Sequence, residues 1–388
     1  MKQLWIAPFA CAVLLAQMHS AITRERGELV QTTEGSIPLA PAARFRFTAV
    51  GTVVVRGGDD PLVSYKIRQR VTASDANGRR DLGPVMVRTS TRGGWSTMTV
   101  AAGDPTRIAT EMYLTVPRNL VETVLSSVAG NVEAYDLDGA VSAETGGGRV
   151  QMDRIGGEAI AKTGGSDIRI GRVNAGLRCF SGGGSIQVDY AGGETWCETA
   201  GGEILIGESA GVVHATTAGG NIRVRRAARS VLARSDGGLI EVGQSGGLVT
   251  AQTRGGSIEV GGSKGVECAS AAGAIRLRGL VGPLRAETAM GSILAELLPG
   301  ARLQESMLSS GLGDITVLIP SNLAVSVRAL SESRNRPARI VSEFPEIRVV
   351  TAGAARGGAI TAEGALNGGG PLLRITASSG VVYLRRQR

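Results

Sequence analysis

Apolar residues recur along the middle of the chain with a period of 18 residues. The clearest column consists of Val150, Ile168, Ile186, Ile204, Ile222, Ile240 and Ile258, and it continues at Ile275, Ile293 and Ile315. A hydroxyl column from Thr145 to Thr288 runs in step with it, and so does a column of alanine and cysteine from Ala143 to Ala286. A short fixed period of this kind is typical of a solenoid.

Each repeat contains two short segments in which apolar residues alternate with other residues. In residues 199–216, Ile204 and Ile206 are expected to point inward from a first strand, and Val213 and Ala215 from a second. One coil buries little by itself, but stacking buries each isoleucine, which contributes about 1.5–3 kcal/mol. The sequence therefore predicts an all-β fold, a single-stranded β-helix (β-solenoid) of about ten 18-residue coils.

Paired glycines stand at one corner of each predicted coil. The pairs are 146–147, 164–165, 182–183, 201–202, 219–220, 237–238 and 255–256. We interpret them as sharp turns with positive φ angles, which glycine adopts without a steric penalty. The neighbouring Thr/Ser column is expected to form a hydroxyl ladder that satisfies the backbone groups of the turns.

The periodicity divides the chain into five parts. Residues 1–21 are expected to be a signal peptide and 22–43 a linker, while the period-two pattern of 44–118 predicts an N-terminal β-domain or cap. Residues 119–319 contain the 18-residue repeats, and 320–388 contain strands that rejoin or cap the solenoid. Solenoid ends require such caps.

The start of the chain predicts export. One lysine precedes about a dozen mainly apolar residues, which suits the central region of a signal peptide and is too short to span a bilayer as a helix. Because no later stretch has transmembrane length, we expect an exported protein of the periplasm, the cell surface or the medium.

The net charge of +8 comes almost entirely from arginine. The only dense cluster comprises Arg223, Arg225, Arg226, Arg229 and Arg234. It is either a basic patch that binds polyanions or a solvated face of the coils. Because acidic residues are interspersed with the arginines elsewhere, no nucleic-acid partner is expected.

No catalytic site, metal site or cofactor is predicted. Ser209, Ser245 and Ser263 match the G-x-S-x-G nucleophile motif, but their spacing by multiples of 18 makes them one corner of the repeat. After the predicted leader the only histidine is His214, and the cysteines lack zinc-ligand spacing. A polysaccharide-acting enzyme would need clustered carboxylates in a groove; outward acids such as Glu241 and Glu259 stack one coil apart, but no general-acid environment can be argued for them.

Cys179 and Cys197 lie one period apart and are expected about 4.8 Å apart in neighbouring coils. This spacing is compatible with a disulfide, but the column direction is poor for one. Their interpretation as small buried residues in place of alanine is preferred.

One outward stripe carries the candidate binding residues. Ile160, Arg178, Trp196, His214, Leu232 and Thr250 follow one another at the repeat spacing, and Phe180 lies diagonally next to Trp196. Apolar surface patches often mark contact sites. The alternative is that residues 320–372 cover the stripe.

The chain resembles the bacterial β-strand-repeat family known as "putative adhesins", whose function is unknown. The resemblance rests on residues 114–117, the Thr/Ser-x-Gly-Gly-x-Ile-x-Val unit, and residues 342–345, 367–371 and 375–380. It implies a β-solenoid and export, and it implies no catalytic residues.

The sequence as a whole predicts an exported, non-enzymatic, adhesin-like interaction or scaffold protein of the cell envelope. A cell-surface glycan or an envelope protein would be its partner. The alternative is a self-assembling filament protein like the bactofilins, although such proteins have neither a signal peptide nor a separate N-terminal domain.

Overall fold

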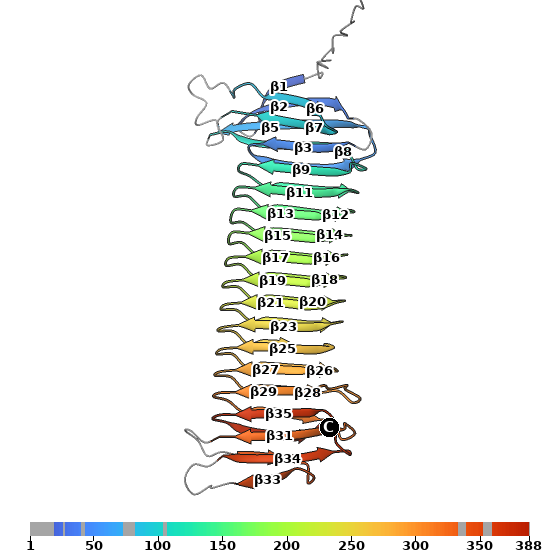
Figure 1. The fold of residues 1–388 in the computed structure, drawn as a ribbon. Helices are drawn as coiled ribbons and strands as arrows, with labels where there is room; N and C mark the ends of the chain where they lie inside the picture. The colour runs from blue at the N-terminus through green and yellow to red at the C-terminus, as the bar shows by residue number, and fades with distance from the viewer. Residues whose placement is uncertain are drawn as a thin grey trace, which may run out of the picture.

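The computed structural model describes residues 19–25, 28–39, 43–72, 82–103, 107–332, 339–351 and 359–387. Its elements are β-strands stacked in a column, with the N-terminal strands at one end and the C-terminal strands at the other (Figure 1). Among the described residues, no helix is long and apolar enough to cross a membrane. The predicted all-β solenoid is confirmed.

Each coil of the column contributes one strand to each of two parallel sheets, here called sheet A and sheet B. The repeat strands of sheet B are β9 (Glu122–Ser127), β11 (Ala140–Thr145), β13 (Ala159–Thr163), β15 (Leu177–Ser181), β17 (Thr195–Thr199), β19 (Val213–Thr217), β21 (Val231–Ser235), β23 (Leu248–Thr253), β25 (Gly265–Ser270), β27 (Leu284–Thr288) and β29 (Ser306–Ser310). Those of sheet A are β10 (Val132–Leu137), β12 (Val150–Ile155), β14 (Ile168–Val173), β16 (Ile186–Ala191), β18 (Ile204–Ser209), β20 (Ile222–Ala227), β22 (Ile240–Ser245), β24 (Ile258–Val260), β26 (Ile275–Leu280), β28 (Ile293–Leu297) and β30 (Ile315–Ile319).

The repeat columns of the sequence become ladders between the sheets. Ile204 pairs with Ile222, and Ile222 pairs with Ile240, in parallel register. These side chains have 0% exposure, so the isoleucine column forms the centre of the core. The register follows from the sequence because a slip by one residue would turn every isoleucine toward solvent.

The paired glycines have a different role from the one predicted, since none of them has a positive φ angle. At Gly220 an added Cβ would lie 2.0 Å from the Gly202 carbonyl oxygen of the preceding coil, whereas at Gly219 the nearest atom, Gly201 O, is 3.7 Å away. Glycine is therefore required at one position of this pair because neighbouring turns approach closely. The expectation of positive φ angles was wrong.

The Thr/Ser column satisfies the backbone of the turns, as predicted. Thr217 Oγ1 donates to Gly202 O of the preceding coil at 3.0 Å and accepts from Gly220 N at 3.2 Å. The same pair of bonds occurs at Thr199 and Thr253. Each hydroxyl thus ties its own turn to the turn of the coil before it.

The N-terminal strands extend both sheets of the solenoid. They are β1 (His19–Glu25), β2 (Glu28–Pro38), β3 (Arg44–Ala49), β4 (Thr52–Gly58), β5 (Leu62–Thr72), β6 (Met86–Arg92), β7 (Trp95–Ala101) and β8 (Ala109–Pro117). β3 lies between β7 and β9 in sheet B, and β4 lies between β8 and β10 in sheet A, all parallel. The strands of residues 44–118 are therefore continuous with the repeats.

The linker predicted for residues 22–43 is replaced in large part by a strand. β2 pairs antiparallel with β5 along its whole length, and Val30 and Thr33 are buried. Its Thr-rich sequence shows little apolar alternation, but the free edge of the long β5 supplies partners for its backbone. Residues 1–18 of the predicted signal peptide lie outside the described residues.

The C-terminal strands return to the column out of chain order. They are β31 (Val325–Ser331), β32 (Arg339–Ser342), β33 (Arg348–Thr351), β34 (Ile360–Leu366), β35 (Leu372–Ala377) and β36 (Val381–Arg386). β35 inserts between β29 and β31, and β36 inserts between β30 and β32. Antiparallel β34 and β33 then close sheet B at this end.

Candidate functional site

The predicted stripe lies on the outer face of sheet B. Arg178, Trp196, His214 and Leu232 pair in register across β15, β17, β19 and β21. Trp196 is 41% exposed and Leu232 is 44% exposed. The described strands of residues 320–372 lie at the C-terminal end of the column, far from these coils (Figure 1). The described part of residues 320–372 therefore does not cover the stripe, contrary to that interpretation.

Trp196 and His214 stack on each other along the column. Their ring centroids are 4.6 Å apart with an interplanar angle of 19°. His214 Nε2 also lies 3.2 Å from Oε1 of Glu194, the residue just before the preceding strand. The stack therefore joins outward side chains of neighbouring coils on this face.

The exposure of Trp196 predicts a small contribution to folding. We expect Trp196→Ser to lower the free energy of unfolding by about 1–2 kcal/mol, through loss of the aromatic stack and part of its buried area. Chemical denaturation followed by circular dichroism measures this. A loss of several kcal/mol would show that the indole is internal in solution.

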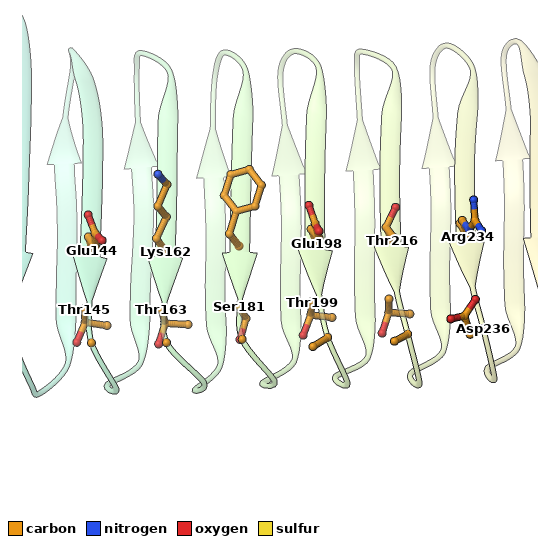
Figure 2. Close-up of a pocket in the computed structure, with 17 residues that line it drawn as sticks. Glu144, Thr145, Lys162, Thr163, Ser181, Glu198, Thr199, Thr216, Arg234 and Asp236 are labelled. Carbon is orange, nitrogen blue, oxygen red and sulfur yellow. The ribbon is translucent and has the colours of Figure 1, made fainter.

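A groove runs along sheet B beside the stripe, where its strands enter the glycine turns. It has a volume of ≈ 700 Å³ and extends from β11 to β21. Figure 2 shows two rows of side chains in it, with Glu144, Lys162, Glu198, Thr216 and Arg234 in the outer row and the Thr/Ser column nearer the turns. Phe180 belongs to the outer row, since it pairs in register with Lys162 and Glu198.

The outer row of the groove contains charges of both signs. Glu144, Lys162, Glu198 and Arg234 are exposed and form no ion pair with one another or with any other described residue. The Lys162 ammonium lies 5.8 Å from the centre of the Phe180 ring. These groups are therefore free to bind a ligand.

On the outer face of sheet A, by contrast, charged side chains form ion pairs. Arg223 pairs with Glu203 and, at 3.3 Å, with Glu241. Arg276 Nη1 lies 2.6 Å from Glu259 Oε1 of the adjacent coil. Glu241 and Glu259 are stacked in register, as predicted, but each carboxylate is held by its own arginine.

The predicted basic patch is divided by the fold. Arg223, Arg225 and Arg226 lie on β20 in sheet A, Arg229 lies in the following turn, and Arg234 lies on β21 in sheet B. A turn separates the two sheets, so the exposed Arg225 and Arg226 lie on the sheet A side and the exposed Arg234 lies on the outer face of sheet B. The five arginines are therefore close in sequence but divided between different faces, and the single patch was a wrong prediction.

The three serines of the nucleophile motif face the interior. Ser209 is fully buried and lies 2.9 Å from Thr195 Oγ1, and Ser245 Oγ donates to Arg229 O at 2.8 Å. Ser263 is buried as well. His214 stands on the outer face, so it faces none of them. Within the described residues, no group of three or more His, Cys, Asp and Glu side chains is placed to hold a metal ion.

Cys179 and Cys197 are in register in adjacent strands and both are free and buried. Burial, followed by the contact with Cys197, raises the pKa of the Cys179 thiol well above its usual value. Burial likewise raises the pKa of Cys268 to about 12. A neutral thiol is thus favoured in the folded state, so the contribution of Cys268 to stability is full below its unfolded pKa and is lost as the pH rises through about 12.

We expect these three thiols to be inert in the folded protein. In a Cys11→Ser background, a chromogenic disulfide reagent at neutral pH should react with them far more slowly than in guanidinium chloride, because the thiolate is the nucleophile. Rapid reaction of a thiol in the native protein would contradict this burial.

The groove was not predicted from the sequence. Its outer row consists of the residues that immediately precede the Thr/Ser column in each repeat. Because these residues are of mixed types, they do not form a recognisable column in the sequence. The available signal was the alternation of charge at the repeat spacing, from Glu144 through Lys162 and Glu198 to Arg234.

No family model matches the sequence, and no curated protein matches it. Among solved structures, the chain is similar to a putative cell adhesion protein from Clostridium sporogenes, with 9% identity, 92% of this chain and 100% of that chain covered, and a TM-score of 0.20. It is also similar to a putative adhesin from Bacteroides fragilis, with 14% identity, 76% and 99% coverage, and a TM-score of 0.20. These names agree with the family that the sequence resembles, but at such identities and TM-scores neither likeness carries an argument about function.

Proposed function

We propose that this chain is an exported, non-enzymatic interaction protein of the cell envelope, and that it binds its partner through the outer face of sheet B. The observation that carries the proposal is the outward stripe of Trp196, His214 and Leu232, in which Trp196 and Leu232 are exposed and His214 is half-buried, on a protein in which aromatic residues make up only 3% of the sequence. Exposed apolar clusters of this kind mark contact surfaces.

The construction of the face supports this role. Its strands are hydrogen-bonded to neighbours on both sides, and its side chains stand on a core of fully buried isoleucines. Such a face is rigid, so a partner would not have to order it on binding. Export rests on the apolar N-terminal segment of the sequence and on the family resemblance.

The test compares two double variants on opposite faces of the same region. Trp196→Ser with Leu232→Ser alters sheet B, and Tyr190→Ser with Leu205→Ser is the matched control on sheet A. We expect the labelled wild-type protein and the control to bind isolated envelopes of the source cells, and the sheet B variant to lose binding while keeping its circular dichroism spectrum. Equal binding by all three proteins would reject the sheet B surface.

The filament alternative is disfavoured by the ends of the column. Antiparallel β1, β2 and β5 extend sheet A beyond the parallel coils at the N-terminal end, and β34 and β33 do the same for sheet B at the C-terminal end. Such strands interrupt the parallel register that end-to-end stacking would continue. Light scattering over a concentration series should therefore give a constant mass. Growth into long particles would instead support the filament alternative.

A further inference from the structure

We propose that the sheet B groove binds a neutral linear glycan whose chain runs along the axis of the solenoid. This inference rests on the proposed function and deepens it, because it assigns a site and a ligand class to the interaction face.

The shape of the groove indicates a polymer. It crosses the ends of β11, β13, β15, β17, β19 and β21, which are successive strands of one sheet. At a strand spacing of about 4.8 Å, these six strands give a track roughly 25 Å long. A ligand that uses the whole track must be extended and must offer similar groups at regular intervals.

The charges of the track indicate a ligand without net charge. Glu144, Lys162, Glu198 and Arg234 follow one another along it with alternating sign, and Asp236, which also lines it, pairs with Arg254 at 3.5 Å. A polyanion would be repelled by the two carboxylates, and a polycation by the ammonium and guanidinium groups. Hydroxyl groups suit both signs, because they donate to a carboxylate and accept from a cation.

The ring of Phe180 adds an apolar surface at the centre of the track. It lies in register between Lys162 and Glu198, one coil from each. An aromatic ring flanked by charged hydrogen-bonding groups matches a sugar ring, which has apolar C–H faces and a polar rim of hydroxyls.

An extended peptide fits the track less well. The strands of sheet B from β11 to β21 are paired on both sides, so their backbone donors and acceptors are already used. Peptides usually bind sheets by adding a strand at an edge. A peptide crossing these strands would leave its own main-chain groups without a ladder of partners.

The experiment measures binding of the full chain to defined oligosaccharides by titration calorimetry. The neutral probes are cellohexaose, maltohexaose and chitohexaose, and the charged comparators are oligogalacturonate and a chitosan oligomer. Phe180→Ala and Glu198→Gln alter the groove. Their matched controls are Tyr190→Ala and Glu208→Gln, each of which lies in the same coil as its counterpart but on sheet A.

We expect at least one neutral probe to bind, and each groove variant to weaken that binding about tenfold or more, which corresponds to ~1.4 kcal/mol. The sheet A controls should leave the dissociation constant unchanged. The proposal is overturned if no neutral probe binds, if only a charged comparator binds, or if the groove variants and their controls have equal affinity.

The two proposals fail separately. If wild-type protein binds envelopes and the Trp196→Ser, Leu232→Ser variant does not, while no neutral glycan binds, the interaction surface stands and the glycan assignment is wrong. If a neutral glycan binds in the groove but envelopes are not bound, the glycan site stands and the envelope role is wrong.

Discussion

Replacing Gly220 by alanine should destabilise the solenoid strongly, whereas the same change at its neighbour Gly219 should not. The added Cβ at Gly220 would meet a backbone oxygen of the preceding coil at 2.0 Å, which no side-chain rotation can relieve. We expect Gly220→Ala to lower the free energy of unfolding by about 3 kcal/mol or more, the upper end of the range for overpacking. Denaturant unfolding followed by circular dichroism measures the loss.

Gly219→Ala is the matched control for this prediction. Its Cβ would have only an ordinary contact at 3.7 Å, and its φ angle is not positive. Alanine at such a position is expected to be neutral or to stabilise by about 0.4–1 kcal/mol, because it restricts the unfolded chain. Equal destabilisation by both changes would mean that the turn conformation, and not the approach of the coils, requires glycine.

The second large effect is expected at the centre of the isoleucine column. Ile222 is fully buried between Ile204 and Ile240. Ile222→Ala should cost about 2–5 kcal/mol, because it removes buried apolar area and leaves a cavity between coils that cannot close without breaking the register. Native-state hydrogen exchange should place the largest loss of protection in the adjacent coils, since each repeat of a solenoid contacts only its neighbours.

Arg225→Ala, on the same strand, is the control for Ile222→Ala. Arg225 is exposed on the outer face of sheet A, and its replacement should change stability by about 0.5 kcal/mol or less. A cost at Ile222 below that of the control would show that the column does not dominate the core.

Much of the fold follows from local patterns in the sequence. The 18-residue period of the isoleucine column fixes both the coil length and the register, because only one register buries Ile204, Ile222 and Ile240 together. The hydrogen bonds between the Thr/Ser column and the turns could also be predicted, since the hydroxyl of a threonine that precedes a glycine turn can bond to the backbone groups of that turn. These features repeat, and repetition makes them visible in one sequence.

The features of the fold that could not be predicted from the sequence depend on contacts between segments that are distant along the chain. Strand β2 could be assigned only once its pairing with β5 was known, because apolar and polar residues alternate weakly in its own sequence. The insertion of β35 between β29 and β31 is a choice among possible edge pairings, which local patterns do not rank.

The candidate site shows the same division. The stripe of Trp196, His214 and Leu232 was predicted by counting the period, but its exposure depended on where residues 320–372 pack. The arginines from Arg223 to Arg234 are close in the sequence and are separated by the turn between two sheets.

The coil, its core and the order of side chains along each face follow from the period and from the alternation within each strand, so they could be predicted from the amino-acid sequence. Which glycine of the 219–220 pair is indispensable, which charges are paired, and where a groove opens on sheet B became known only from the folded chain. These properties depend on distances between atoms of neighbouring coils, and a sequence period specifies which residues are neighbours but not how closely their atoms approach.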